Sequence, residues 1–235
     1  MKIADFKNLF ESAQHLFNQG KNIKALKNLE EAMKYANEEE QSQGFELFGK
    51  IYNRTQEMEK ALAYYLKALK GTVNVNNRIS ILNKIALLYA GKKNYEKSIE
   101  YYNKCLEKVQ EMADINKEML ILKNLGKLYM RNDEYIDALK CHQRVLALKR
   151  LAGDKLGEAA NLRYIGQTYE NSGNFEIAKD YYMKSVELYK QIGDMQGVEK
   201  VQKLIEDLEE LEEEIEEEAD LMDDWNIQYD SDDFF

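Results

Sequence analysis

Several residue types and patterns are scarce or missing in this sequence of 235 residues, and each absence limits what the protein can be. Two cysteines, Cys105 and Cys141, are too few for a disulfide framework. No apolar run approaches the length needed to span a bilayer, and Asp5 and Lys7 interrupt any secretory hydrophobic segment. We therefore expect a soluble protein inside the cell.

The residues that build most catalytic sites are also scarce. The two histidines, His15 and His142, lie far apart in the sequence, no glycine-rich phosphate loop is present, and no metal-ligand spacing occurs. Few groups therefore remain for nucleophilic, acid–base or metal chemistry. We expect a protein that is not an enzyme and that needs neither a cofactor nor a metal ion.

Basic residues are absent from the last part of the chain. All 33 Lys and Arg lie at or before Lys203, where 27 acidic residues leave a net charge of +6. From Leu204 onward there are 16 acidic residues and no basic one, which brings the whole chain to −10. The charge is therefore bipolar along the sequence.

The dominant pattern that is present is a repeat with a period of forty residues. Large, small and aromatic residues recur at fixed offsets, so that Leu122, Leu125, Gly126, Tyr129, Tyr135 and Ala138 match Leu162, Ile165, Gly166, Tyr169, Phe175 and Ala178. The connector Gly153-Asp154 returns as Gly193-Asp194, and weaker copies extend toward the N-terminus. Such self-similarity is typical of stacked supersecondary units. Because small residues let two helices approach closely, each copy is predicted to be a helical hairpin.

These residues resemble the tetratricopeptide repeat, with five copies near 6–39, 42–75, 79–112, 119–152 and 159–192. The resemblance implies an all-α, right-handed superhelical solenoid of five helical hairpins over residues 1–193, closed by a C-terminal capping helix. The family's usual proline after the second helix is missing, and the chain has no proline at all. With the long period and the Gly-Asp connectors, this is similar to the long-helix subtype of Pins/LGN-type scaffolds, kinesin light chains and bacterial Rap-type regulators.

Three local features carry further expectations. Cys105 takes a position where the family places a small buried residue, so a packed thiol is expected. His142 replaces an aromatic packing residue, which favours a half-buried structural role over a ligand or catalytic base. Glu38-Glu39-Glu40 is interpreted as the end of the first hairpin, because the C-terminal end of a helix disfavours acidic side chains.

After residue 193 the second half of a sixth repeat does not follow. One apolar stripe instead predicts a helix over 194–219, formed by Val201, Leu204, Leu208, Leu211 and Ile215. Such a stripe can cover the end of the last repeat or pair with another helix. We expect a cap from Val201 to Leu208, and pairing stays open beyond Leu211.

The last sixteen residues, 220–235, mix six acids with large apolar side chains. Acid-rich composition without a core predicts disorder unless the segment is bound. A short binding motif and an inert acidic tail are both compatible with this composition. The motif residues would be Trp225, Ile227, Tyr229, Phe234 and Phe235.

In the family that this chain resembles, the first helices of successive repeats line a concave groove. The corresponding positions are rich in basic residues and in amides, which can hydrogen-bond an extended peptide backbone. The predicted groove residues are Lys50, Asn53, Arg54, Asn83, Lys84, Lys123, Asn124, Lys127, Arg131, Arg163, Tyr164 and Gln167. Phe10 and Gln14 stand where a carboxylate clamp would place Lys and Asn, which disfavours chaperone-tail binding. The alternative explanation for these basic and amide residues is that every helix simply needs a polar face.

The favoured function is a non-enzymatic scaffold or adaptor that binds an acidic or mixed peptide or helix of a partner protein. The setting implied by resemblance is a polarity, motor or ciliary assembly in the cytoplasm, with no membrane partner. In a variant of this hypothesis, the chain's own acidic segment 204–235 folds over the groove. The alternative is a chaperone-like binder of basic proteins such as histones through the acidic segment, which leaves a nuclear location open. Nucleic acid is a poor candidate, because the tail would repel phosphates and the basic residues are not interleaved with stacking aromatics.

Overall fold

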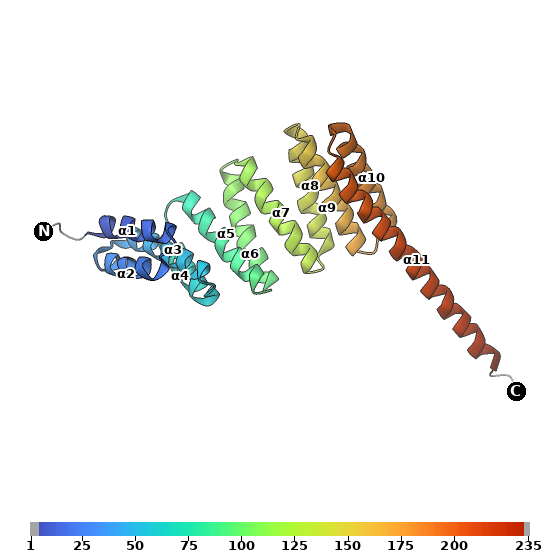
Figure 1. Ribbon diagram of the computed structural model, residues 1–235, viewed down its shortest axis with the longest axis horizontal. Coiled ribbons are helices and arrows are strands. Elements are labelled where there is room, and N and C mark those ends of the chain that lie inside the picture. Colours follow the sequence, from blue (N-terminus) through green and yellow to red (C-terminus); the bar gives the residue numbers. More distant parts are fainter. Residues whose placement is uncertain (1–4, 233–235) are drawn as a thin grey trace. The chain divides into compact units, whose positions relative to one another are not determined.

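The computed structural model describes residues 5–232, and every long regular element in that range is an α-helix (Figure 1), which confirms the all-α prediction. The chain divides into two compact units, Met1–Leu128 and Tyr129–Phe235, with the boundary inside α7. The helices are α1 (Phe6–Asn18), α2 (Asn22–Ala32), α3 (Glu38–Arg54), α4 (Met58–Gly71), α5 (Val75–Gly91), α6 (Tyr95–Glu111), α7 (Ile115–Arg131), α8 (Tyr135–Leu151), α9 (Lys155–Asn171), α10 (Phe175–Ile192) and α11 (Met195–Asp232), with a short 3₁₀ helix at Met33–Tyr35. No helix among the described residues is both long and apolar enough to cross a membrane.

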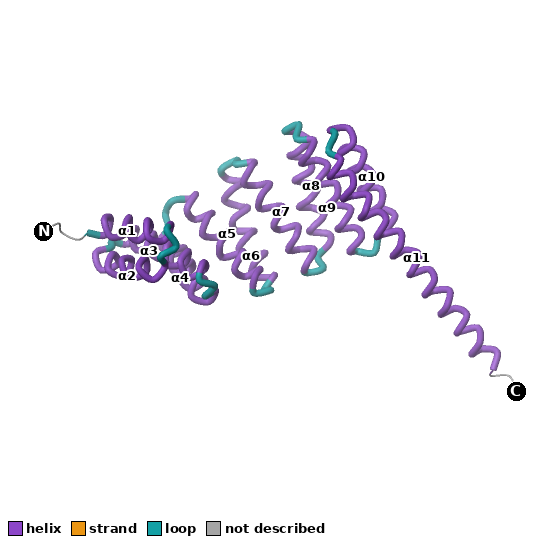
Figure 2. The backbone as a smooth tube through the Cα atoms, viewed as in Figure 1, coloured by secondary structure: helices purple, strands orange, loops and turns teal. Residues whose placement is uncertain are grey.

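Short connections join the helices (Figure 2), and polar residues fix where the helices begin. The side chains of Asp114, Asp154 and Asp194 each accept a hydrogen bond from the backbone N–H three residues on, at 3.1, 2.8 and 3.0 Å. These bonds satisfy N–H groups that a helix start leaves without an internal partner. The two Gly-Asp connectors therefore work as a unit: Gly153 and Gly193 take left-handed φ angles of 67° and 76°, and the following Asp starts the next helix.

The prediction that Glu38-Glu39-Glu40 ends the first hairpin is wrong. The second helix of the first hairpin ends before it, and the triplet forms the first turn of α3. Asn37 and Glu40 make a reciprocal capping box, in which each side chain accepts a hydrogen bond from the other residue's backbone N–H. Acidic side chains are favoured at this end of the helix dipole, which is the physical reason for the difference.

Within a hairpin, a glycine of the first helix lies against a tyrosine ring of the second. A Cβ atom added at Gly49 would lie 2.7 Å from Tyr65, and one added at Gly166 would lie 2.6 Å from Tyr182. Both tyrosines are buried. The small and aromatic positions of the repeat therefore form one packing unit, which lets paired helices approach closely.

The thiol of Cys105 is fully buried and lies 3.6 Å from the backbone oxygen of Ile79. Ser185 occupies the matching position in the last hairpin, where its hydroxyl donates to the oxygen of Ala159 at 2.8 Å. Burial raises the pKa of Cys105 and of Cys141 to about 11, so both thiols stay protonated at neutral pH. The predicted packed thiol is confirmed.

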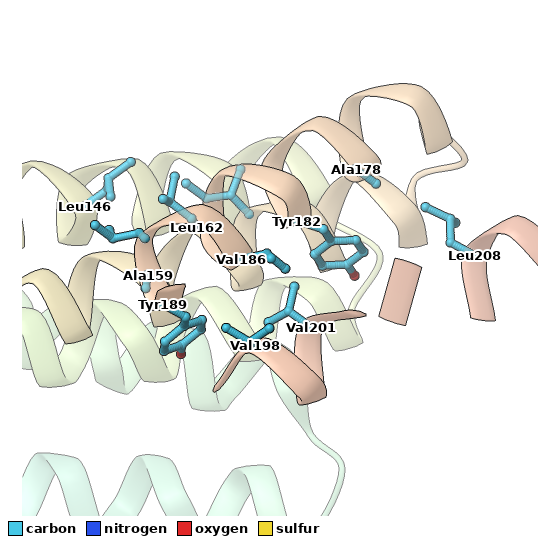
Figure 3. Packing of buried hydrophobic residues seen from close by; sticks show 12 residues of the cluster. Leu146, Ala159, Leu162, Ala178, Tyr182, Val186, Tyr189, Val198, Val201 and Leu208 are labelled. Carbon is cyan, nitrogen blue, oxygen red and sulfur yellow. The ribbon is translucent and has the colours of Figure 1, made fainter. Parts of the chain in front are cut away.

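The first part of α11 covers the last hairpin of the second unit. Val198, Val201 and Leu208 are buried against α10 residues that include Tyr182 and Tyr189, as Figure 3 shows. The predicted cap over Val201 to Leu208 is therefore confirmed. By contrast, Leu211 and Ile215 of the same stripe remain 38% and 45% exposed.

The helix α11 extends further than the sequence pattern predicts. It continues without interruption to Asp232, whereas helix was expected only over 194–219 and disorder beyond residue 219. No proline or glycine occurs after Gly197, and the intervening Glu-rich sequence has good helix propensity, so nothing local ends the helix. The backbone at Trp225, Ile227 and Tyr229 is therefore helical, while Phe234 and Phe235 lie outside the described residues.

Candidate functional site

The first helices of the hairpins lie side by side in the unit Met1–Leu128. Helix α1 contacts α3, Lys84 of α5 reaches Glu46 of α3 at 2.7 Å, and Lys117 of α7 donates to Asn76 of α5 at 3.1 Å. Each of these contacts joins neighbouring first helices. We call the surface that these helices share the first-helix face. In the repeat frame it carries Phe10, Glu46, Asn83 and Lys123, each three residues before the small packing position of its helix.

Glu46 is the electrostatic centre of this face between α3 and α5. Its carboxylate pairs with Lys50 at 2.8 Å and with Lys84 at 2.7 Å, and its side chain is only 17% exposed. Burial acts to raise the pKa of Glu46, but the hydrogen bonds from the two lysines outweigh it and hold the pKa below its usual value. Two of the predicted groove cations therefore already share one carboxylate of the array, which compensates one of their two positive charges.

The pKa of Lys84 is lowered in spite of its ion pair, because burial disfavours the charged ammonium more strongly than Glu46 favours it. Its Nζ atom also lies 5.7 Å from the centre of the Tyr65 ring. Lys84 therefore belongs to the packing between two hairpins. Asn83, beside it, has a buried Oδ1 atom that accepts no hydrogen bond from the described residues.

Arg54, at the end of α3, is held by the first hairpin. Its guanidinium carbon lies 3.5 Å from the centre of the Phe17 ring, and Nη1 donates a hydrogen bond to the backbone oxygen of Phe17. This arrangement is a cation–π contact supported by a hydrogen bond. The residue is nevertheless exposed, as is its neighbour Asn53.

The basic side chains of α7 differ from Lys50 and Lys84, which share an ion pair with Glu46. Lys123 is half-buried and has no ion-pair partner among the described residues, and Lys127, one turn further on, is exposed. Asn124 donates to the hydroxyl of Tyr102 at 3.2 Å, so this predicted peptide contact instead ties α7 to the preceding hairpin. Lys123 is therefore a cation of the first-helix face that no carboxylate among the described residues compensates.

The remaining predicted residues lie in the second unit. Arg163 donates to Gln167 at 3.0 Å and lies 4.4 Å from the Tyr164 ring centre, and Arg131 is exposed at the end of α7. Tyr164 stacks on His142 at 5.6 Å with an angle of 9° between the rings. His142 is 1% exposed, so the predicted packing role is confirmed, although the ring is fully buried instead of half-buried.

Sequence reasoning missed a groove at the start of the array. A cavity of about 480 Å³ opens between α1 and the beginning of α3. Phe6 and Phe10 stack in it at 5.1 Å, and its rim carries Glu11 and Glu39, both exposed. The other lining residues are Lys7, Gln14, Asn37, Glu40 and Gln43. Phe10 and Gln14 could have signalled it, but they attracted notice only as departures from a carboxylate clamp.

Comparison with known proteins identifies the repeats. The family model described as tetratricopeptide repeat matches residues 40–111 and 118–191, which together make up more than half of the chain. Among curated proteins, no sequence matches this chain.

Solved structures with the same fold include BtubC from P. vanneervenii, which is 22% identical with a TM-score of 0.61 and alignment over 77% of this chain and 78% of that one. The kinesin light chain TPR-like repeats of P. anserina are 12% identical with a TM-score of 0.65 over 80% of this chain and 96% of that one. YrrB, a TPR protein with an unusual peptide-binding site, is 14% identical with a TM-score of 0.62 over 83% and 90%. These identities establish the shared fold alone. The expected likeness to kinesin light chains is confirmed at that level, and the Pins/LGN-type subtype stays a prediction.

Proposed function

Because the chain belongs to the tetratricopeptide repeat family, we propose that it is a non-enzymatic scaffold that binds an acidic or mixed peptide or helix of a partner protein on its first-helix face. The observation that carries the proposal is the contrast between two cationic clusters. Lys50 and Lys84 already hold the Glu46 carboxylate, whereas Lys123 on α7 has no acidic partner among the described residues. A carboxylate of a ligand would supply that partner.

The expected affinity follows from the position of these cations. Lys123 is half-buried, so its ammonium is less screened than a fully exposed one, and Lys127 adds a second cation one turn away. Acidic side chains of the ligand would be steered to α7, and binding would weaken as the salt concentration rises. The setting we propose is a polarity, motor or ciliary assembly in the cytoplasm.

The test uses peptides selected on the protein from a random-sequence display library. Reversing both charges in K123E/K127E should weaken the binding of acidic library peptides by roughly a hundredfold, since two attractive contacts become repulsive. The matched control K24E/K27E makes the same charge change on the second helix α2 and should leave binding unchanged. Unaltered affinity in K123E/K127E, with helicity intact by circular dichroism, would remove α7 from the site.

A second candidate function is capture of a basic protein by the acidic part of α11. It is favoured by Leu211 and Ile215, which are 38% and 45% exposed and lie among glutamates. An apolar ridge flanked by acids fits a basic amphipathic helix, of which histone segments are one example. Deleting 213–235 should then abolish binding of core histones. Histone binding that survives the deletion would exclude this function.

A further inference from the structure

The groove between α1 and α3 differs in charge from the rest of the first-helix face. Its lining residues include Lys7 and three glutamates, which give a net charge of −2. Glu40 is engaged in the capping box, but Glu11 and Glu39 are exposed and form no ion pair with any described residue. The groove therefore presents carboxylates where α7 presents ammonium groups.

Three regions of contrasting charge thus follow one another along the first helices of the unit Met1–Leu128. The α1–α3 groove is acidic, the Glu46, Lys50 and Lys84 cluster between α3 and α5 is internally paired, and α7 carries the uncompensated Lys123. Phe10 in the groove occupies the same repeat position as Glu46 and Lys123 on their helices. The acidic groove and the cationic helix therefore belong to one face.

We infer that the α1–α3 groove binds a basic, arginine-containing part of the same partner segment whose acidic part contacts α7. This inference rests on the proposed function, because it assumes that a partner segment lies along the first-helix face. The ligand is therefore bipolar, with one cationic end and one anionic end. The order of its charges decides which end lies on α1 and fixes its direction along the array.

Arginine suits this groove better than lysine for two reasons. The half-buried Phe10 ring, stacked on Phe6, offers an aromatic surface to a planar guanidinium. Two carboxylates, Glu11 and Glu39, rise from different helices and can each accept a charge-assisted hydrogen bond from the guanidinium fork. The cavity of about 480 Å³ is large enough for one such side chain together with the adjoining backbone.

The inference is tested with synthetic peptides built from a glutamate-rich half joined either to an arginine-rich half or to a neutral half. On the unaltered protein the bipolar peptide should bind roughly tenfold more tightly than the acidic–neutral peptide. Replacing its arginines by lysines should weaken binding severalfold. Two bipolar peptides that differ only in the order of their halves should bind with different affinities, because only one order matches the direction of the ligand along the array.

Variants of the protein locate the effect. In E11Q/E39Q the advantage of the bipolar peptide should disappear. It should remain in the control E38Q, which removes one carboxylate from the same first turn of α3 but outside the groove and is compared with the single variant E39Q. Equal binding of bipolar and acidic–neutral peptides to the unaltered protein would overturn the inference. If K123E/K127E then still abolished binding of both peptides, the proposed function would stand without the inference about the α1–α3 groove. Failure of every peptide to bind the unaltered protein would reject the proposed function itself.

Discussion

Single residues decide how closely the paired helices approach. At Gly166 a methyl group would lie 2.6 Å from the ring of Tyr182 and 3.2 Å from the backbone oxygen of Ala178, and the tyrosine is fully buried. We expect Gly166→Ala to lower the free energy of unfolding by about 1–3 kcal/mol through overpacking, even though alanine favours helix. Chemical denaturation measures this change.

Gly91 supplies the matched control for that substitution. It ends α5, and an added Cβ there would meet no atom within 4 Å. Gly91→Ala should therefore be neutral or stabilising by up to about 1 kcal/mol. Equal effects of the two substitutions would contradict the packing unit of glycine and tyrosine.

Glu46 gives the fold a pH dependence. Burial raises the pKa of its carboxyl, but hydrogen bonds from Lys50 and Lys84 lower it by more, so the folded-state pKa lies below the ordinary value of 4.5. Such a group stabilises the fold above its ordinary pKa, and the contribution is lost as the pH falls through the folded-state pKa. Glu46→Gln should cost about 1–2 kcal/mol at neutral pH. In thermal melts the difference from the unaltered protein should vanish in acid; a difference independent of pH would show that the ion pairs do not cause it.

A residue's environment was predictable from the sequence where it recurs with the forty-residue repeat, and not elsewhere. Buried positions such as Cys105 and His142 follow from the frame, because packing sites recur with the period. The pairing of Glu46 with Lys50 and Lys84 does not, since it depends on which long side chains meet across two helices. A count of basic residues therefore overestimated the uncompensated charge of the face.

At the scale of elements, α11 ends the array by covering it and then continuing past it. Leu208 is 1% exposed in the core of the second unit, whereas Leu211, on the same stripe, is 38% exposed. Leu208→Ala should lower the free energy of unfolding by about 2–5 kcal/mol, because it leaves a cavity beneath the cap. Leu211→Ala should change it by no more than about 0.5 kcal/mol. Similar losses in chemical denaturation would mean that the cap extends further along α11 than the structure shows.

The existence of the elements was predictable, but some of their ends were not. Period and small–aromatic spacing predict the hairpins and the cap, since both reflect packing. The start of α3 depends instead on the capping box of Asn37 and Glu40, which reverses the meaning of three consecutive glutamates. The length of α11 depends on the absence of any stop signal after Gly197, a weaker cue than the composition that suggested disorder.

At the scale of the whole molecule, the central claim is that a partner segment lies along the first-helix face and not on the surface of the second helices. Leu87 on the first helix α5 is 52% exposed and lies one helical turn after Asn83 and Lys84, and Ile23 on the second helix α2 is 85% exposed. Both are apolar and accessible, so a photo-crosslinking amino acid is tolerated at either position. They report on a first helix and on a second helix, from different hairpins of the same unit.

The most direct measurement is photo-crosslinking of a library-selected acidic peptide from position 87 and, in a separate protein, from position 23. We expect a crosslinked product from position 87 that high salt and K123E/K127E both suppress, and none from position 23. Crosslinking from position 23 alone, or equally from both positions in every variant, would contradict binding on the first-helix face.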